Sequence, residues 1–274
     1  MSKVALVTGA SSGIGLETAL LLVEKGFIVY GAARRTNLIK PLEDKGGKAL
    51  FLDLNDDDSI VACVDTVLKN EGRLDVLVNN SGYGLGGSLE AVPLEEAKKQ
   101  FQVNVFGLAR ITQLVLPTMR KQRSGRIINI SSMAGRFSTP FSCWYHASKY
   151  SVEALSDSLR MELKPFGIKV SIIEPGMIQT NWGAIHAQNI RKYTGDDDYA
   201  KFADKVAIWY EKHYLTKGKI AKPTVISRAI LRAACAKNPK TRYKVGTGSK
   251  LNIFVASHVG NRLLDFITLK ALGI

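Results

Sequence analysis

A tyrosine and a lysine four residues apart form the pair with the clearest chemical potential in this 274-residue chain. They are Tyr145 and Lys149, in the stretch CWYHASKYSVEAL (residues 143–155). The stretch is predicted to be helical, and side chains four apart on a helix share a face. A free phenol has a pKa of about 10, which a neighbouring ammonium group lowers by stabilising the phenolate. The spacing therefore predicts that Tyr145 exchanges a proton near neutral pH, with Lys149 lowering its pKa.

Two further polar side chains are candidates for the same site. Ser132 lies thirteen residues before Tyr145 at the end of a predicted strand, and its hydroxyl group could hold a substrate oxygen. Asn104 interrupts the apolar stretch VNVFG. An asparagine in the middle of a helix can also bond nearby backbone groups, and this alternative stays open for Asn104.

A glycine-rich turn, TGASSGIG (residues 8–15), joins the first predicted strand to the first predicted helix. Glycines let the backbone approach a phosphate, and the N-terminus of a helix offers unpaired N–H groups and partial positive charge. The glycine spacing differs from both G-x-G-x-x-G and the mononucleotide P-loop. The turn predicts dinucleotide binding; the alternative is a tight turn without a ligand. The residues expected to contact the dinucleotide are Gly9, Ser11, Ser12, Gly13, Ile14 and Gly15.

Two arginines follow the second predicted strand. A carboxylate at this position would bind the adenosine ribose hydroxyls of NAD, but the next acid along the chain is Glu43. Arg34 and Arg35 stand there instead, and guanidinium groups bind phosphates through directed hydrogen bonds. The pair predicts NADP(H), with NAD(H) less favoured; the alternative is that both arginines only solvate a loop.

Polar residues after the third and fourth predicted strands are candidates for the adenosine side of the cofactor. Asp53 could accept a hydrogen bond from the adenine amino group, with Leu54 offering main-chain contacts. The alternative is that Asp53 caps the next helix. The stretch NNSG (79–82) adds Asn80, Ser81 and Gly82 to the predicted site.

Strand-like and helix-like segments alternate along the chain. This order predicts an α/β fold, a doubly wound parallel sheet of the Rossmann type with helices on both faces, in a single domain. Ligands of such sheets bind at the carboxyl ends of the strands, which is where the polar motifs above fall. The seven predicted strands cover residues 3–8, 27–33, 48–54, 74–80, 125–132, 168–176 and 242–246.

Six motifs together resemble the short-chain dehydrogenase/reductase family. They are TGASSGIG, NNSG, the asparagine of VNVFG, the serine of NISSMAG, YHASK and EPGMIQT, in this order. The resemblance implies an oxidoreductase that interconverts a carbonyl compound and an alcohol with a nicotinamide cofactor. Many NADP-dependent members carry a basic residue in the glycine-rich turn, where this chain has Ser12.

The resemblance also implies roles for individual residues. Tyr145 is the acid or base, Ser132 polarises the carbonyl group, and Lys149 binds the nicotinamide ribose. Asn104 is expected to hold a water molecule of a proton relay. The nicotinamide end of the cofactor is expected to contact Pro175, Gly176, Ile178 and Thr180. The alternative to an enzyme is a non-catalytic relative that binds the dinucleotide as a regulator or scaffold.

Residues 181–220 are predicted to form a substrate lid. The stretch 181–214 holds seven of the 22 Phe, Trp and Tyr residues of the chain. A helix is expected from Asp198, with Asp196–Asp198 as its acidic start and one apolar face. That face either packs on the core or covers a lipophilic substrate. The pattern resembles the hydroxysteroid and retinol dehydrogenase-like branch of the family. The residues of the predicted apolar face are Tyr199, Phe202, Val206, Trp209, Tyr210 and His213.

Positive charge is concentrated in the last part of the chain. Between Lys212 and Ile274 there are thirteen Lys and Arg residues and one acid, Asp265, whereas the chain as a whole carries +14. The basic region (221–274) is expected to be solvated, or to contact an anionic membrane surface or substrate. Residues 250–272 are predicted to form one amphipathic helix suited to such a surface. The sequence has no nucleic-acid recognition motif, so specific nucleic-acid binding is not expected.

Composition sets the remaining bounds. Hydrophobic residues make up 46% and charged residues 23% of the chain, as in ordinary globular proteins. Three widely spaced cysteines give no metal or disulfide pattern. No apolar run is long enough to span a membrane, and the start of the chain does not resemble a signal peptide, so a cytoplasmic protein is expected. A core (1–180), the lid and the basic region form the expected single unit (1–274), and the resemblance implies a homodimer or homotetramer.

Overall fold

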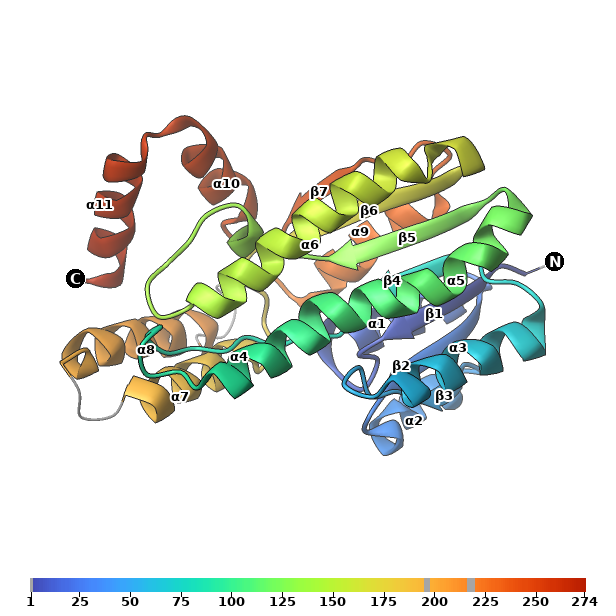
Figure 1. Cartoon of the computed structure of the whole chain (residues 1–274), viewed down its shortest axis with the longest axis horizontal. Helices are drawn as coiled ribbons and strands as arrows, with labels where there is room; N and C mark the ends of the chain where they lie inside the picture. Colours follow the sequence, from blue (N-terminus) through green and yellow to red (C-terminus); the bar gives the residue numbers. More distant parts are fainter. Residues whose placement is uncertain (1, 195–197, 216–219) are drawn as a thin grey trace.

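Seven parallel strands form one sheet in the order β3-β2-β1-β4-β5-β6-β7. The computed structural model describes residues 2–194, 198–215 and 220–274 (Figure 1). Every predicted strand is present, and the predicted doubly wound α/β sheet is confirmed. The strands are β1 (Val4–Thr8), β2 (Ile28–Ala33), β3 (Lys48–Phe51), β4 (Val76–Asn79), β5 (Gly125–Ile130), β6 (Ile168–Pro175) and β7 (Arg242–Val245).

The central strands are apolar along their whole length because helices cover both faces of the sheet. All five residues of β1 and all four of β4 are buried. Alternate side chains of β1 enter two different cores: Val7 packs with α1 and α9, whereas Leu6 packs with α3 and α5. These two cores fix the sheet between its helix layers and hold the strand ends in place.

Helices of the first 165 residues and α9 build the two layers around the sheet, as Figure 1 shows. Four short helical segments, three 3-10 and one π, interrupt the connections: η1 (Thr36–Ile39), η2 (Gln102–Gly107), η3 (Met133–Gly135) and η4 (Lys164–Phe166). The layer helices are α1 (Gly13–Glu24), α2 (Lys40–Glu43), α3 (Asp57–Glu71), α5 (Leu108–Gln122), α6 (Cys143–Glu162) and α9 (Pro223–Cys235). Helix α4 (Leu94–Phe101) precedes η2 and packs against α6.

The remaining helices lie beyond the carboxyl ends of the strands. They are α7 (Trp182–Thr194), α8 (Ala200–Leu215), α10 (Ser249–His258) and α11 (Asn261–Leu272). Figure 1 shows α7 and α8 side by side and α11 at the far end of the molecule from β1. The expected start of the helix at Asp198 is two residues early, since α8 begins at Ala200. Asp196 and Asp197 lie outside the described residues.

The single helix predicted over residues 250–272 is wrong. The chain forms two helices there, because Val259 and Gly260 take extended backbone angles and interrupt the helical hydrogen bonds. Glycine is a weak helix former, which favours a break at this point. The chain turns back between α10 and α11, which together are called the C-terminal hairpin (Figure 1). No helix in the described ranges combines the length and the hydropathy of a membrane-crossing segment.

Candidate active site

One cavity of about 1150 Å³ opens at the carboxyl ends of the strands. It runs from the glycine-rich turn past Ser132, Tyr145 and Lys149 to α8 and the C-terminal hairpin. The strand ends place the motifs of β1, β2, β4, β5 and β6 around this one space, as expected for a doubly wound sheet.

Tyr145 is buried near the start of α6, and its side chain lines the cavity. Burial raises the pKa of its phenol to about 12, and a hydrogen bond with the Ser132 side chain opposes the rise. The Ser132 hydroxyl also accepts a hydrogen bond from the Ala134 backbone N–H at 3.1 Å, which caps η3. The serine and the tyrosine are thus in contact, as the sequence predicts.

Lys149 lies one turn after Tyr145 and is also buried. Its Nζ atom donates a hydrogen bond to the Ile130 carbonyl oxygen at 2.8 Å and lies 5.9 Å from the centre of the Tyr145 ring. Burial lowers the pKa of this lysine to about 8, and the negative charge of Glu153 opposes the fall.

The predicted lowering of the Tyr145 pKa by Lys149 is therefore not what this structure shows. The phenol pKa moves in the opposite direction, because its loss of water outweighs the attraction of neighbouring groups. The ammonium group of Lys149 is bound to a backbone carbonyl rather than to the phenol oxygen. In this arrangement Tyr145 is a protonated phenol at neutral pH.

Asn104 does not line the cavity. It lies in the π-helical segment η2, where its Oδ1 atom accepts a hydrogen bond from the Tyr83 N–H at 3.1 Å. Its Nδ2 atom donates to the Tyr83 carbonyl at 3.0 Å and to the Ser148 hydroxyl at 3.1 Å. Asn104 therefore fastens the backbone of the loop after β4, 21 residues away, which differs from the bonding to nearby backbone groups that the sequence left open. The predicted role of Asn104 in holding a relay water stays a prediction.

The glycine-rich turn has the shape that a phosphate-binding loop needs. Gly9 and Gly13 have φ angles of +68° and +54°, which suit glycine far better than other residues. A Cβ atom on Gly15 would lie 2.2 Å from the Gly9 carbonyl oxygen, so this position holds the turn against α1 instead of lining the cavity. Ser12 precedes α1 and makes no side-chain capping bond. The first N–H groups of α1 are therefore available to an anion.

Arg34 and Arg35 line the cavity at the end of β2 with exposed side chains. Neither guanidinium group has a hydrogen-bond or ion-pair partner among the described residues. Two unpaired cations beside the turn suit a ligand with an additional phosphate group.

Asp53 and Leu54 line the cavity beyond the end of β3. The alternative role of Asp53 as a helix cap is wrong, because Asp56 caps α3 by accepting a hydrogen bond from the Asp58 N–H. The Asp53 carboxylate instead accepts two hydrogen bonds from Asn55, at 3.0 and 2.8 Å. These bonds fix the carboxylate at the wall of the cavity.

The loop after β4 is fastened to the end of β1. The backbone N–H groups of Asn80 and Ser81 both donate to the Thr8 hydroxyl at 3.0 Å. The Asn80 side chain also donates to the Thr8 carbonyl at 3.0 Å. This loop therefore keeps a fixed position beside the glycine-rich turn, with Gly82 next to Asn104.

The segment after β6 closes the other side of the cavity. Gly176 donates to the Val245 carbonyl at 2.8 Å, and a Cβ atom there would lie 2.1 Å from the Thr247 carbonyl oxygen. This close approach explains a glycine at the position. The Thr180 hydroxyl accepts a hydrogen bond from the Trp182 N–H at the start of α7.

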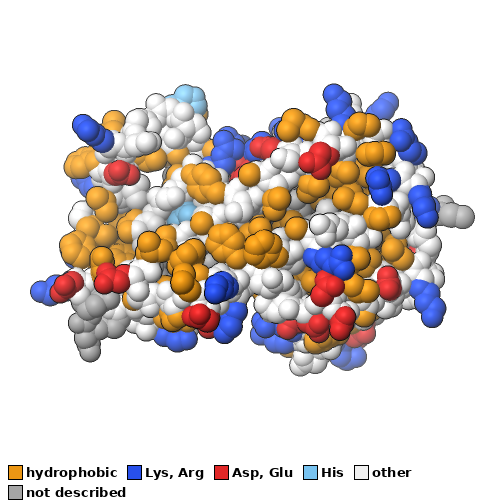
Figure 2. Space-filling model, in the orientation of Figure 1, with side chains coloured by type: hydrophobic (Ala, Val, Ile, Leu, Met, Phe, Trp, Pro, Cys, Tyr) orange, Lys and Arg blue, Asp and Glu red, His pale blue; other side chains and the backbone are white. Residues whose placement is uncertain are grey.

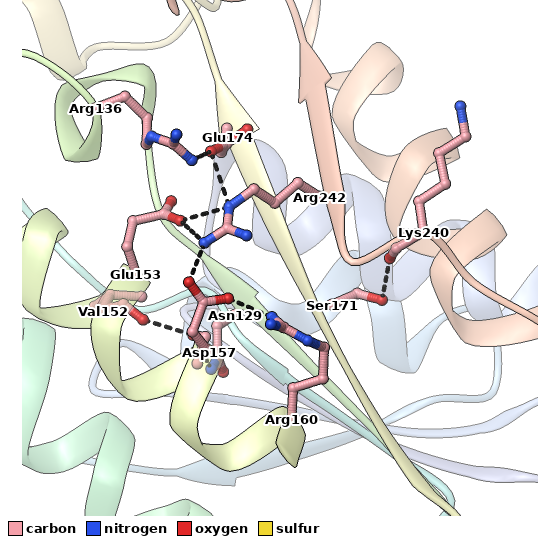
Figure 3. A network of polar contacts seen from close by, with 11 residues as sticks. Asn129, Arg136, Val152, Glu153, Asp157, Arg160, Ser171, Glu174, Lys240 and Arg242 are labelled. Atoms are coloured by element: carbon pink, nitrogen blue, oxygen red, sulfur yellow. Dashed lines mark hydrogen bonds and ion pairs between the residues drawn. The ribbon is translucent and has the colours of Figure 1, made fainter. Parts of the chain in front are cut away.

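An ion-pair network around Arg242 connects the helix and strands next to the site (Figure 3). Arg242 on β7 contacts carboxylates of α6, with Nε 3.1 Å from Glu153 Oε2 and Nη2 2.6 Å from Asp157 Oδ2. Its Nε atom is also 3.5 Å from Glu174 Oε1 at the end of β6, and Arg136 Nη1 lies 3.3 Å from the same oxygen. The network joins α6, the helix that carries Tyr145, to β6, the strand that leads into residues 175–180.

Burial raises the pKa of both Glu153 and Glu174, and the arginines and a hydrogen bond from Ser131 to Glu153 oppose the rise. Glu153 stands one turn after Lys149 on α6. A carboxylate at this position favours the charged form of the lysine. The sequence analysis missed the network, and no local motif identifies it, because its members come from four separate segments.

Nearly all predicted site residues meet in the cavity, and Gly15 and Asn104 are the two that do not line it. The sequence missed part of the lining: Tyr83, Met133 and the residues of α10 and α11. The 3- and 4-residue spacing of apolar residues on α11 is a usable signal, but by itself it equally fits a face that binds a surface. The predicted residues that line the cavity are Gly9, Ser11, Ser12, Gly13, Ile14, Arg34, Arg35, Asp53, Leu54, Asn80, Ser81, Gly82, Ser132, Tyr145, Lys149, Pro175, Gly176, Ile178 and Thr180.

The predicted apolar face of α8 is confirmed in part. Val206 and Tyr210 are buried against α7, and Trp209 lines the cavity, whereas Tyr199 and Phe202 are exposed. Aromatic rings link this helix to the catalytic tyrosine candidate. The ring of Trp182 lies 5.1 Å from that of Tyr145 and 5.9 Å from that of Tyr210.

Comparisons with known proteins agree with this geometry. The family model for short chain dehydrogenases matches residues 3–190. A 3-ketodihydrosphingosine reductase of Bacteroides thetaiotaomicron is 40% identical over 246 residues, covering 89% of this chain and 88% of the relative. An NADPH-dependent 3-dehydrocapnine reductase of Ornithobacterium rhinotracheale is 34% identical over 282 aligned residues, covering 98% and 97%. Neither name supports the hydroxysteroid or retinol subtype, which stays a prediction.

Solved structures show the same fold and bind both forms of the cofactor. A short-chain dehydrogenase from Streptomyces avermitilis is 32% identical with a TM-score of 0.80, covering 99% of this chain and 97% of that one. A metagenomic short-chain oxidoreductase in complex with NADP is 28% identical with a TM-score of 0.69, covering 89% and 97%. A relative from Burkholderia phymatum in complex with NAD is 25% identical with a TM-score of 0.72, covering 85% of each chain. The chain belongs to the short-chain dehydrogenase/reductase family of oxidoreductases.

Proposed function

We propose that the protein is an NADP(H)-dependent oxidoreductase that interconverts a carbonyl group and a secondary or primary alcohol on a lipophilic substrate. The observation that carries the proposal is the convergence of Ser132, Tyr145 and Lys149 on one cavity. One end of that cavity is a glycine-rich phosphate cradle, and the other end has aromatic and aliphatic walls.

The residues of the cradle fit the dinucleotide. The turn at Gly9 and Gly13 and the free N–H groups of α1 would hold its pyrophosphate, while Asp53 and the loop after β4 would line its adenosine half. Pro175, Gly176, Ile178 and Thr180 would lie along the nicotinamide half. When bound, the cofactor supplies or accepts the hydride, and the protein supplies orientation and the proton.

Tyr145 acts as the proton donor in the direction of reduction. A phenol with a pKa of about 12 stays protonated at neutral pH, so it can donate a hydrogen bond to a carbonyl oxygen and then its proton. Ser132, already in contact with this phenol, holds the same oxygen. In the direction of oxidation, Tyr145 takes the proton back as a base.

Lys149 assists the tyrosine and binds the nicotinamide ribose. Its ammonium group lies 5.9 Å from the centre of the Tyr145 ring and lines the cavity, where it would bind the ribose. Positive charge there stabilises a developing phenolate, which a rigid, buried site makes more effective than water does. Asn104 holds the Tyr83 loop in place and, in this proposal, a relay water near Lys149.

The preference for NADP(H) rests on the two unpaired arginines. Arg34 and Arg35 lie at the end of β2, where they would bind a 2′-phosphate, and no carboxylate of β2 is present to bind a free ribose hydroxyl pair. The relative that reduces 3-dehydrocapnine is also named as NADPH-dependent. Both relatives are named as reductases, one of them of a 3-keto compound, which favours a ketone as the physiological substrate here.

The proposal is tested by following NADPH absorbance with a panel of ketones that range from water-soluble to lipophilic, with NADH in parallel. We expect turnover with lipophilic ketones and a clear preference for NADPH. Tight NADPH binding without turnover across the panel would contradict the proposal and favour a non-catalytic regulatory or scaffold protein. Faster turnover with NADH would contradict the assignment of the arginines. Oligomeric state stays a prediction from the family.

A further inference from the structure

The far end of the cavity is built by the C-terminal hairpin, defined here as α10 and α11. The cavity-lining residues of α11 recur at intervals of three and four, so they form one face of the helix. From Leu264 to Leu272 this face runs about 12 Å along the helix axis. The lining residues of the hairpin are Leu251, Asn252, Val255, Leu264, Ile267, Thr268, Ala271 and Leu272.

The hairpin is attached to the catalytic region on two sides. Leu272 is buried in the cluster that includes Tyr210 and Trp182, whose ring lies 5.1 Å from Tyr145. The Asn252 side chain on α10 approaches the sulfur of Met133, next to Ser132, at 3.8 Å. The apolar face of the hairpin is therefore continuous with the site of the proposed proton transfer.

This part of the cavity is uncharged. None of the lining side chains contributed by α7, α8, α10 and α11, within the described ranges, is acidic or basic. A substrate with a phosphate or carboxylate at this end would lose its hydration without gaining an ionic partner, which is costly. A hydrocarbon chain gains free energy in such a site because each methylene group leaves water.

The groove is open at its outer end. Leu251 and Ile267 line it although 67% and 41% of their surfaces are exposed. Figure 2 shows hydrophobic side chains gathered over the part of the molecule where Figure 1 places α8 and α11. An open groove sets no upper limit on the length of a chain, since excess methylene groups extend into solvent.

We propose that the C-terminal hairpin binds the unbranched hydrocarbon chain of a long-chain ketone whose carbonyl group lies at Ser132 and Tyr145. This inference rests on the proposed function and adds the chemical class of the substrate and the residues that select it. Aromatic rings near Tyr145 contact the first part of the chain, and the aliphatic face of α11 contacts the rest.

The test compares methyl ketones of increasing length: butan-2-one, octan-2-one, dodecan-2-one and hexadecan-2-one, each with NADPH. In the wild-type protein we expect kcat/KM to rise by up to about fourfold for each methylene group and then to level off when the groove is filled. Thr268→Phe places a ring in the groove and should remove most of the gain for the two longest ketones.

Leu263→Phe is the matched control. Leu263 lies on the outer face of α11, where it is exposed and does not line the cavity, so this variant should retain the full dependence on chain length. Binding is measured separately by titrating hexadecan-2-one against tryptophan fluorescence, because Trp182 and Trp209 line the cavity. Thr268→Phe should weaken this binding and Leu263→Phe should not.

The outcomes separate the two proposals. Turnover of short ketones without any gain for longer ones, or a gain that Thr268→Phe does not reduce, would overturn the chain-binding site and leave the proposed reaction standing. Binding of hexadecan-2-one that depends on Thr268, without turnover of any ketone, would overturn the proposed reaction and keep the chain-binding site. Absence of both binding and chain-length dependence would overturn the hairpin site itself.

Discussion

The two ends of the cavity are built in different ways. At the end with the glycine-rich turn, the backbone mainly shapes the cavity. Glycines there approach carbonyl oxygens closely, and loop N–H groups donate to the Thr8 hydroxyl. At the substrate end, side chains of four helices form the walls. The family model ends at residue 190, so it covers the first end and omits α8, α10 and α11. The matched part of the chain thus shapes its end of the cavity mainly with backbone, whereas the helices beyond it shape the other end with side chains.

The largest effect on stability and cofactor binding is expected from a substitution in the glycine-rich turn, where no space is left for a side chain. Gly15→Ala would place a Cβ atom 2.2 Å from the backbone oxygen of Gly9, and such overpacking costs about 1–3 kcal/mol or more. We expect a lower Tm and weak NADPH binding, measured by thermal unfolding and cofactor titration. Gly260→Ala is the control, because nothing lies within 4 Å of a Cβ atom there and its φ is not positive. Normal NADPH affinity in Gly15→Ala would show that the cradle is less rigid than described.

The next effect concerns the charge that distinguishes the two dinucleotides. Arg34→Ala should raise KM for NADPH by about 10- to 100-fold, the range for losing a hydrogen bond to a charged group, and leave KM for NADH nearly unchanged. Steady-state kinetics with each cofactor measure this. Arg35→Ala, made alongside, shows which guanidinium group contributes more. Equal losses with both cofactors would mean that the arginines support the loop and not the phosphate.

A smaller effect is expected from the network behind the site. Burial lowers the pKa of Lys149 to about 8 and Glu153 opposes this, so Glu153→Gln should lower the lysine pKa further. The alkaline limb of kcat/KM against pH should then shift to lower pH, because the charged lysine is lost earlier. The groups facing Lys149 from neighbouring elements are the Ile130 carbonyl and Asn104, with Arg136, Glu174 and Arg242 behind Glu153.

Asp157→Asn is the matched control for this prediction. Asp157 also contacts Arg242 from α6, but it is two turns from Lys149 and more exposed than Glu153. The alkaline limb of this variant should coincide with that of the wild type. Equal shifts in both variants would show that the network acts through the position of Arg242 and not through the charge beside the lysine.

The smallest effect is a change of stability with pH at the substrate end. Burial lowers the pKa of His186 to about 3, and this histidine stacks on Trp182. The unfolded chain protonates it below about pH 6.5, so the unfolded state binds more protons and stability falls as the pH is lowered from there toward 3. Between about pH 7 and about pH 5, Tm should fall more for the wild type than for His186→Gln. Parallel curves would contradict a buried neutral histidine.

The end of the cavity at the glycine-rich turn could be predicted from the sequence better than the end formed by the helices. The strand ends of a parallel sheet meet at one edge, so Gly9, Arg34, Asp53 and Ser132 could be placed together from their positions after strands. The cap of α3 is harder to assign, because Asp53 and Asp56 both precede the helix, and Asp56 is the one whose side chain accepts a hydrogen bond from the first turn. The order of the strands and the residue types after them were sufficient to predict the part of the site that the backbone shapes.

The features that the sequence did not predict depend on contacts between residues that are far apart in the chain. Whether the predicted helix over residues 250–272 lies on a surface or folds back is decided by the break at Val259 and Gly260 and by contacts with α8. The pKa of Tyr145 depends on how much water reaches it, which spacing alone cannot reveal. The Arg242 network joins β7 to α6 over more than eighty residues of sequence.

The central claim is that the Tyr145 hydroxyl transfers the proton. Tyr145→Phe removes this one oxygen and keeps the ring that packs against Trp182. Its rate of NADPH oxidation with the best ketone should fall roughly 10²- to 10⁴-fold, while NADPH titration gives an unchanged Kd. A variant that binds NADPH and retains the wild-type rate would contradict this account of the active site.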